Sequence, residues 1–469
     1  MTSRTNLRCP LCGGGLTARA EALYCRCGMR YPLLEGVPVL VDQTLVETMP
    51  QPWPDDVLQE LLRALELKDT QKPLLEAIFS KRVRFPTEWM QAEADQFMHR
   101  VAPSHPALAA ALAVEQPQAL LAGPTAPINS NPALKLSCLV APRSLHPSQQ
   151  LRFNLRLYNC SCSVLSSSST QPLNLAYRWH RPGVSPIEGL RTPLLIDLPP
   201  GASQSLPVLV QAPETPGHYV LELLPVHETV AWLEDSALRF PVEVQSGCGP
   251  NQPDWPETHH QRDYHHDHLE GLRLLQQWCQ RHVHRQQPVL VELGGNAHPL
   301  IAQLHHPGSQ RFCVDIDPYG VAVGHHLIQP RNAGVQFVVA DGLQLPFGRR
   351  SLDLVALFAS FHHFPDPIAL LRHLRSLLRP SGLVCLLCEP VGHVERSTLD
   401  PTFRHELEKG VNEQSFALWE YAWMAKQAGY RVVEAQVDLG SLKLALQPLP
   451  RLQRLALRLK PQPCHPPLP

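Results

Sequence analysis

The chain has 469 residues, which predicts two to four domains at roughly 100–200 residues per domain. Hydrophobic residues make up 44% of the sequence, enough to form real cores, so a wholly disordered chain is excluded. The formal net charge is −1, from 41 basic and 42 acidic residues, and this balance does not favour a nucleic-acid partner. Proline is frequent, with 48 residues, which favours linkers and β-rich segments over a helical bundle.

Neither a membrane span nor a secretory signal is visible in the sequence. No apolar run reaches the roughly 18–20 residues that cross a bilayer. The first residues also lack the apolar core of a signal peptide. We therefore expect a cytoplasmic protein, and the sequence leaves its oligomeric state open.

The first segment, residues 1–45, is defined by its cysteines. Cys9 and Cys12 form one close pair, and Cys25 and Cys27 form a second, tighter pair. Two such pairs can supply the four sulfur ligands that structural zinc prefers. A segment this short cannot bury a stable core alone, so a metal would have a clear structural purpose. We predict a closed, non-catalytic zinc site; the alternatives are free or redox-active thiols and a ribbon that has lost its metal.

Residues 31–41 (YPLLEGVPVLV), together with the cysteine pairs, resemble the Trm-type zinc-ribbon family of methyltransferase activators. Members of that family often precede or partner with methyltransferases. The tight C-x-C pair departs from the usual C-x2-C spacing of such ribbons. The resemblance implies a small zinc ribbon at the start of this chain.

Three further segments precede the C-terminal part of the chain. Leucines at helical spacing predict two or three short helices within 46–100, and the Pro- and Ala-rich stretch at 101–133 reads as a linker. Residues 134–246 contain short apolar runs separated by turn signals, and 151–157 alternate with a period of two. This pattern predicts an antiparallel β-sandwich.

An ordered set of motifs between 176 and 232 resembles the immunoglobulin-like β-sandwich of bacterial polysaccharide-cluster proteins. Some relatives of that sandwich bind glycans. The resemblance makes four side chains candidates for contact with a sugar: Tyr177, Trp179, His227 and Trp232. The alternative is that Trp179, like Tyr219, belongs to the core.

The C-terminal segment, residues 257–445, alternates helical patterns with buried-strand runs at 289–293, 312–316, 337–340, 352–358 and 383–387. This alternation predicts an α/β domain with a mostly parallel, Rossmann-like sheet. The tail at 446–469 is Pro-rich and mildly basic. The expected architecture is therefore multidomain: a small ribbon with helices, a β-sandwich and an α/β domain.

Polar residues follow the first three of these strands. Gly294 and Gly295 allow the backbone to approach a ligand closely. Asp315 is the second-last residue of the run at 312–316, where a carboxylate can hold both ribose hydroxyls. Asp341 ends the third run and can lie near an adenine amine.

In order and spacing, these residues, the LPF at 345–347, the LDLV at 352–355, the histidine pair at 362–363 and the RPSG at 379–382 resemble class I S-adenosylmethionine-dependent methyltransferases. Asn296 and His298 stand where the family has its second and third loop glycines. The resemblance implies S-adenosylmethionine as cofactor, bound by Tyr264, His268, Glu292, Gly294, Gly295, Asn296, Asp315, Ile316, Asp341, Gly342, Leu343 and Ala359.

Methyl transfer to a hydroxyl requires removal of a proton. The candidate bases are His362, His363 and Glu389, each near the carboxyl end of a strand, although the histidine pair has a structural role in many members of the family. Residues 411–430 resemble a late segment of sugar and surface-polysaccharide methyltransferases, which makes Asn412 and Glu413 candidates for the acceptor site; a helix cap is the alternative.

We expect a methyltransferase that O-methylates a sugar of a surface glycan or its precursor. The alternatives are an RNA or protein methyltransferase, suggested by the ribbon, and a non-catalytic glycan-binding scaffold. The scaffold hypothesis is motivated by Asn296 and His298.

Overall fold

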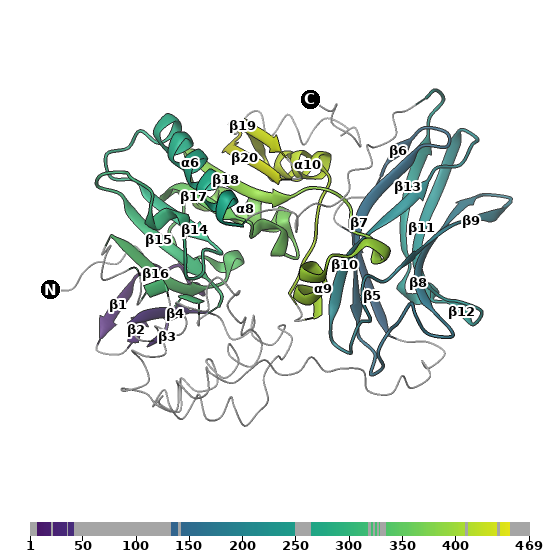
Figure 1. Cartoon of the computed structure of the whole chain (residues 1–469), viewed down its shortest axis with the longest axis horizontal. Helices are drawn as coiled ribbons and strands as arrows, with labels where there is room; N and C mark the ends of the chain where they lie inside the picture. The colour runs from purple at the N-terminus through teal and green to yellow at the C-terminus, as the bar shows by residue number, and fades with distance from the viewer. Residues whose placement is uncertain are drawn as a thin grey trace.

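The computed structural model describes residues 7–19, 22–34, 36–41, 133–138, 142–248, 264–317, 320–321, 324–325, 328, 334–408, 411–438 and 441–450. Figure 1 shows an α/β unit with the N-terminal strands against one end of it, and an all-β unit at the other side of the molecule. The helices predicted within 46–100, nearly all of the predicted linker and the tail beyond 450 lie outside the described residues. Among the described helices, none has the length and apolar character needed to cross a membrane.

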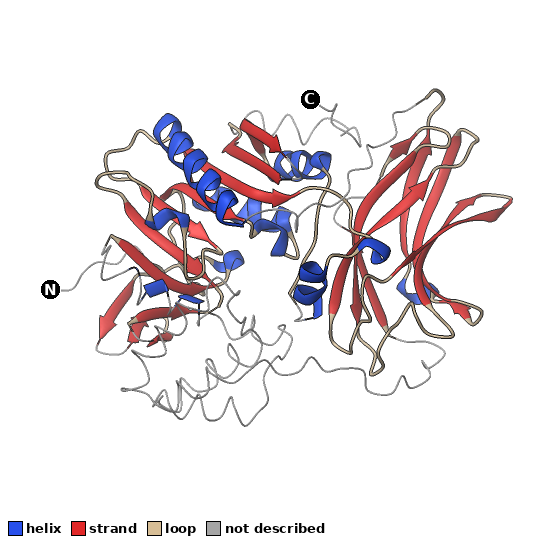
Figure 2. Ribbon diagram, viewed as in Figure 1, coloured by secondary structure: helices blue, strands red, loops and turns tan. Residues whose placement is uncertain are grey.

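Five parallel strands form the centre of the α/β unit (Figure 2). They lie side by side in the order β16-β15-β14-β17-β18, and two antiparallel strands, β20 and β19, continue the sheet beyond β18. The bounds are β14 (Val289–Leu293), β15 (Gln310–Asp315), β16 (Val335–Ala340), β17 (Leu352–Phe358), β18 (Leu378–Pro390), β19 (Tyr430–Asp438) and β20 (Ser441–Pro448).

Helices cover both faces of this sheet. Leu290 and Leu354 pack in one apolar cluster with α6 (Tyr264–His282). Their neighbours Val291 and Val355 belong to the opposite cluster, which contains α8 (Pro367–Leu377) and α10 (Leu418–Ala428). Successive residues of a strand point to opposite faces, so a sheet covered on both sides needs continuous apolar strands. This explains the nearly continuous apolar runs in the sequence.

The N-terminal strands extend the same sheet. They are β1 (Leu16–Arg19), β2 (Ala22–Cys25), β3 (Arg30–Leu34) and β4 (Val37–Leu40), which pair antiparallel with one another. β4 then pairs in parallel with β16, Val39 opposite Val339 and Leu40 opposite Ala340. Tyr31 is 1% exposed and lies in the same apolar cluster as the central strands. The N-terminal segment therefore covers an edge of the α/β sheet. The sequence analysis predicted a small ribbon at residues 1–45 but not this pairing with the sheet.

The all-β unit consists of two sheets that face each other. One has the order β10-β7-β5 and the other β6-β13-β11-β8-β9, with β12 paired to β11. The bounds are β5 (Leu134–Cys138), β6 (Ser144–Leu145), β7 (Gln150–Asn159), β8 (Leu173–Arg181), β9 (Val184–Pro193), β10 (Ser203–Gln211), β11 (Gly217–His227), β12 (Ala231–Trp232) and β13 (Leu238–Val244). Leu151, Leu155 and Leu157 of β7 are buried, as the period-two pattern predicts.

Three of the four side chains proposed for sugar contact lie in the interior. Tyr177, Trp179 and His227 are each 2% exposed, and Trp179 packs edge-to-face on Tyr219. Trp179 is therefore a core residue of the sandwich, as the alternative in the sequence analysis predicted. The ring of Trp232 already holds the guanidinium groups of two arginines, each 4.7 Å from its centroid. Three of the four residues are therefore buried, and the partly exposed ring of Trp232 is in contact with Arg178 and Arg191.

The all-β unit packs against the segment of the α/β unit between β18 and α10. This segment includes α9 (Pro401–Glu408), which Figure 1 places beside β5 and β10. Phe403, Leu407 and Trp419 belong to the same buried cluster as the sandwich core. At the rim, Arg152 pairs with Glu395 at 2.8 Å. The contact is therefore apolar at its centre and charged at its edge, and it joins the two units.

Asn154 makes a buried polar contact at the centre of this interface. Its side-chain amide donates to the carbonyl oxygen of Ser415 at 2.9 Å and lies 3.3 Å from a carboxylate oxygen of Glu420. Glu420 also accepts the backbone N–H of Ala417 at 2.8 Å, at the start of α10. Burial raises the pKa of Glu420 to about 7. One sandwich residue thus holds the loop that leads into α10.

We expect Asn154→Ala to lower the free energy of unfolding by about 1–3 kcal/mol, because buried acceptors on Ser415 and Glu420 lose their donor. Urea unfolding of the full chain measures the change. The matched control is Arg152→Ala at the exposed rim of the same interface, for which we expect about 0–1 kcal/mol. Equal changes for the two variants would contradict a special role for the buried amide.

The raised pKa of Glu420 predicts a pH dependence of stability. The folded state favours the protonated acid, so its stabilising contribution is complete below the unfolded pKa of about 4.5 and is lost as pH rises through about 7. Glu420→Gln is neutral at every pH and should reduce this loss. Thermal unfolding between pH 4.5 and 8 tests it, and parallel pH curves for wild type and variant would refute it.

Candidate functional site

Three carboxylates lie at or just beyond the carboxyl ends of adjacent parallel strands. Glu292 is in β14, Asp315 ends β15, and Asp341 follows β16. β15 and β16 lie on one side of β14 in the sheet, and the next strand along the chain, β17, lies on the other side. Ligands of open α/β sheets bind beyond the carboxyl ends at such a reversal of strand order. The sheet topology therefore brings the predicted carboxylates to the expected ligand-binding edge.

Asp315 is held in a fixed orientation by the backbone. One of its oxygens accepts the N–H of Asn296 at 3.1 Å, and the other accepts the N–H of Asp317 at 3.0 Å. A carboxylate has about four lone-pair directions, so these two bonds leave capacity for hydroxyl donors. Asp315 is half-buried, in a position to meet a ligand.

Glu292 shapes the loop beyond β14. It is 1% exposed, and its carboxylate accepts the backbone N–H of Ile301 at 2.7 Å. Burial raises the pKa of Glu292 to about 7, and the nearby charge of Asp315 acts in the same direction. This geometry supports the predicted role in orienting the loop.

The loop after β14 is tightly constrained. Gly294 has a φ of 80°, and a Cβ there would lie 2.6 Å from the side chain of Ser360. Asn296 also adopts a left-handed backbone, with φ 45°, and its amide donates to Asp317 at 3.1 Å. A Cβ on Gly320 would lie 1.6 Å from the Asn296 amide oxygen. The asparagine that replaces a family glycine is thus accommodated by a glycine elsewhere.

The other predicted cofactor residues surround this edge. Asp341 accepts the N–H of Leu343 at 3.1 Å and so begins the short turn at 342–344. His268 donates to the carbonyl oxygen of His298 at 3.1 Å and joins α6 to the loop. The remaining residues follow the strand ends or line the loop: Gly295, Ile316, Gly342 and Ala359. Helix α6 begins at Tyr264, whose side chain lies outside the described residues.

The predicted bases form a cluster with Glu413. His362 Nδ1 lies 2.8 Å from Glu389, and His362 Nε2 lies 3.1 Å from Glu413 Oε1. His363 Nε2 lies 2.8 Å from Glu413 Oε2. Asn412 adds a bond from its amide to the carbonyl oxygen of His363 at 3.0 Å. We name His362, His363, Glu389 and Glu413 the His–Glu cluster.

The members of the His–Glu cluster differ in exposure. The side chains of His362, Glu389 and Glu413 are at most 2% exposed, whereas His363 is 22% exposed. Burial alone would lower the pKa of His362, but the charge of Glu413 and the bond to Glu389 outweigh it and raise the pKa to about 9. An imidazole that is already protonated at neutral pH is poorly suited to be a base. Of the three predicted bases, His363 faces outward.

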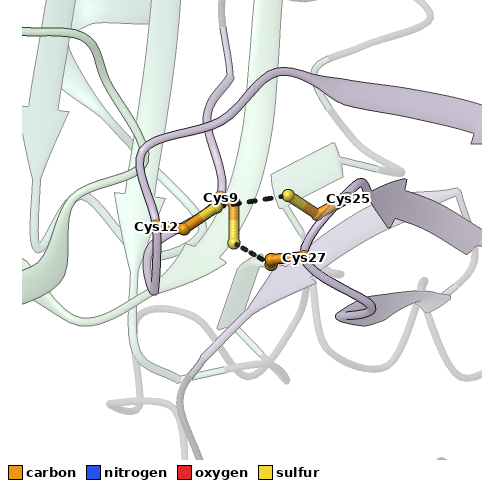
Figure 3. Close-up of side chains that lie close together, drawn as sticks. All are labelled: Cys9, Cys12, Cys25 and Cys27. Atoms are coloured by element: carbon orange, nitrogen blue, oxygen red, sulfur yellow. Dashed lines mark hydrogen bonds between the residues drawn. The ribbon is translucent and has the colours of Figure 1, made fainter.

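The four N-terminal cysteines converge at one point (Figure 3). The sulfur atoms of Cys9 and Cys27 are 3.7 Å apart, and those of Cys12 and Cys25 are 3.4 Å apart. With zinc–sulfur bonds of about 2.3 Å, tetrahedral ligands lie about 3.8 Å apart, so this spacing fits zinc. The Tyr31 hydroxyl lies 3.1 Å from the Cys9 sulfur and can support the thiolate. The C-x-C pair therefore does not prevent the four sulfurs from meeting.

Residues 291–386 match the family model described as a methyltransferase domain. This part of the chain is therefore similar to a methyltransferase domain. The match begins within β14 and ends within β18, and it includes Glu292, Asp315, Asp341 and the histidine pair, whereas Glu389 lies beyond it. S-adenosylmethionine is therefore the expected cofactor of the methyltransferase domain.

Solved structures similar to this chain include a complex of the Haloferax volcanii Trm112 methyltransferase activator with a putative methyltransferase, at 18% identity, TM-score 0.32, 40% of this chain and 90% of that chain. A SAM-dependent methyltransferase from Aquifex aeolicus matches at 14% identity, TM-score 0.31, 39% of this chain and 93% of that one. The Burkholderia thailandensis 1,6-didemethyltoxoflavin-N1-methyltransferase matches at 20% identity and TM-score 0.32, and the match covers 41% of this chain and 84% of that one.

Sequence reasoning placed Glu413 near the acceptor but did not connect it to the histidines. It lies 50 residues after His363, beyond the matched part of the methyltransferase domain. Asp317, which accepts the Asn296 amide, was also missed. Its signal was present, since it follows Asp315 by two residues at a strand end.

Proposed function

We propose that this protein is an S-adenosylmethionine-dependent methyltransferase that transfers a methyl group to a sugar hydroxyl of a surface glycan or its precursor. The observation that carries the first part is the row of carboxylates at the edge of β14, β15 and β16, inside the matched methyltransferase domain. Asp315 would hold the ribose hydroxyls, and Asp341 with Leu343 would frame the adenine. The two glycines of the β14 loop leave space for the backbone to approach the cofactor.

The cofactor, when bound, supplies a methyl group on a sulfonium sulfur. The residues of this chain must then align the acceptor oxygen and exclude competing water. The His–Glu cluster follows β17 and meets the loop that precedes α10. Its outward-facing member, His363, is the residue that we expect an acceptor hydroxyl to meet.

The sugar acceptor is supported by the 411–430 segment, which resembles sugar and surface-polysaccharide methyltransferases. In the structure, Asn412 and Glu413 of this segment contact His363. The buried aromatic residues of the sandwich give no support to glycan binding there. Our proposal for the acceptor therefore depends on the loop before α10.

A transfer assay separates the possible acceptors. We would incubate the full chain with methyl-labelled S-adenosylmethionine and, in parallel, with nucleotide sugars, polysaccharide fractions, RNA and protein extracts. Label in a glycan fraction, reduced by His363→Ala but not by the exposed-site control His284→Ala, supports the proposal. Label in RNA or protein would replace the glycan with the alternative acceptor. Failure of the folded chain to bind the cofactor would favour the scaffold.

A further inference from the structure

We propose that His362, His363 and Glu413 bind a divalent transition-metal cation of the zinc and cobalt type at the acceptor side of the methyltransferase domain. The catalytic role of this cation rests on the proposed function, whereas the binding site itself does not. It is distinct from the four-cysteine cluster, because it uses nitrogen and oxygen ligands from the other end of the chain.

The ligand atoms have the spacing of a metal site. One atom from each of the three residues can be chosen so that all lie within 4.8 Å of one another. Both histidines direct Nε2 at Glu413, at 3.1 and 2.8 Å, one to each carboxylate oxygen. With metal–ligand bonds of about 2.0–2.2 Å, adjacent ligands lie about 3–3.5 Å apart. A cation among these atoms therefore requires only a small adjustment.

A second carboxylate orients the buried histidine. His362 Nδ1 lies 2.8 Å from Glu389, which leaves Nε2 directed at Glu413. Glu389 is itself fixed, because it accepts backbone N–H groups of Ser360 and Phe361 at 3.1 and 3.0 Å. Histidines that bind metals commonly use their other ring nitrogen in this way. The cluster thus contains both the ligands and the partner that positions one of them.

The charge of the His–Glu cluster also suits a dication. Glu389 and Glu413 are at most 2% exposed, and two buried carboxylates need two positive charges nearby. A divalent cation supplies both when it displaces the proton that His362 otherwise carries, because metal binding requires a neutral imidazole. The three-ligand set, histidine, histidine and carboxylate, is one that leaves further coordination positions open.

The more exposed ligand, His363, indicates where the open position faces. A hydroxyl that binds a cation there loses its proton more readily, because the cation stabilises the oxyanion. In the reaction, the hydroxyl proton leaves to solvent, the sulfonium sulfur–methyl bond breaks, and the new oxygen–methyl bond forms. The sulfonium becomes the neutral thioether S-adenosylhomocysteine. A bound cation would lower the pKa of the acceptor hydroxyl, so that solvent could take its proton without a side-chain base.

Cobalt titration of the metal-free full chain tests the site. Co²⁺ bound by thiolates shows sulfur-to-metal charge-transfer absorption, which a histidine and carboxylate site lacks. We expect about two equivalents to bind, only one of them with thiolate character. Glu413→Gln and His363→Ala should each lose the equivalent without thiolate absorption and keep the other, while His284→Ala should keep both.

Glu389→Gln should lower the affinity for the cobalt equivalent without thiolate absorption by about 10-fold or more, without abolishing its binding. Circular dichroism of each variant verifies that it is folded, and His363→Ala, at a half-exposed position, remains informative if Glu413→Gln unfolds. Absence of a cobalt equivalent without thiolate absorption in the wild type, or its persistence in both ligand variants, would overturn the metal site. A chain that binds S-adenosylmethionine but lacks this equivalent refutes this inference alone, whereas binding of this equivalent without cofactor binding refutes the proposed function alone.

Discussion

Cys25→Ser is expected to destabilise the methyltransferase domain, although the cysteine lies far from it in sequence. If the four sulfurs hold structural zinc, losing one ligand removes a contribution that is on the order of 10 kcal/mol in small zinc domains. The β1–β4 segment is too small to keep its fold without that contribution. We therefore expect the free energy of unfolding of the N-terminal strands to fall by several kcal/mol.

We expect the loss of stability to extend to the parallel sheet, because β4 pairs with β16. Val39 and Leu40 pair with the last residues of β16, and Leu40 packs in the same apolar cluster as Phe312. When β4 detaches, the edge of β16 loses its hydrogen-bond partner and its cover. Hydrogen exchange should then become faster at 335–340, the strand that precedes Asp341.

Hydrogen exchange of wild type, Cys25→Ser and Cys160→Ser, followed by thermal unfolding, measures both effects. Cys160 is an exposed cysteine outside the cluster, so its substitution should change neither. Unchanged protection of β16 in Cys25→Ser would show that the strand pairing does not depend on the cluster. Metal analysis of the same samples identifies the bound ion.

The parallel strands were predictable because their signals are local. Residues 289–293 and 352–358 are apolar except for one carboxylate in each run, Glu292 and Asp353, and burial on both faces of a sheet favours such nearly continuous apolar runs. Asp315 and Asp341 were predictable as site residues for a related reason, since carboxyl ends of adjacent parallel strands meet at one edge. The short strands of the sandwich carried an equally local signal in the alternation of β7.

Contacts between distant segments were not predictable. Nothing in residues 37–40 indicates that they pair with β16, because edge pairing uses backbone groups that any sequence offers. Asn154 has the same character: it stands at an outward position of a sandwich strand, and only the fold shows that Ser415 and Glu420 lie against it. The surroundings of His362 likewise depend on Glu413, a residue contributed by a separate loop.

Asp315→Ala is expected to weaken binding of S-adenosylmethionine at least about 100-fold. Each hydrogen bond between a hydroxyl and a charged carboxylate contributes about 1.5–3 kcal/mol, and Asp315 would make such bonds to the two ribose hydroxyls. Two bonds correspond to about 3–6 kcal/mol, and 1.4 kcal/mol is a factor of ten. Alanine also removes the acceptor for the N–H groups of Asn296 and Asp317, which hold the loop.

Asp315→Asn separates the two effects. The amide keeps the size of the side chain and one acceptor oxygen, so the loop should be retained while the ribose loses charged acceptors. Its affinity should therefore fall between wild type and alanine. The matched control is Asp353→Asn in β17, since Asp353 accepts the N–H of Val289 and pairs with Arg379 at 3.2 Å. That change should lower stability and leave cofactor affinity unchanged.

Calorimetric titration of the full chain measures these affinities, with a wild-type value in the micromolar range, on the order of −8 kcal/mol. Wild-type affinity in Asp315→Ala would place the ribose elsewhere and remove the main support for our assignment of the carboxylate row. No saturation in a folded wild type would show that the loop with Asn296 does not accept the cofactor, and would leave the scaffold as the better explanation. Graded loss from asparagine to alanine, with Asp353→Asn unaffected, ties cofactor binding to the carboxylate that ends β15.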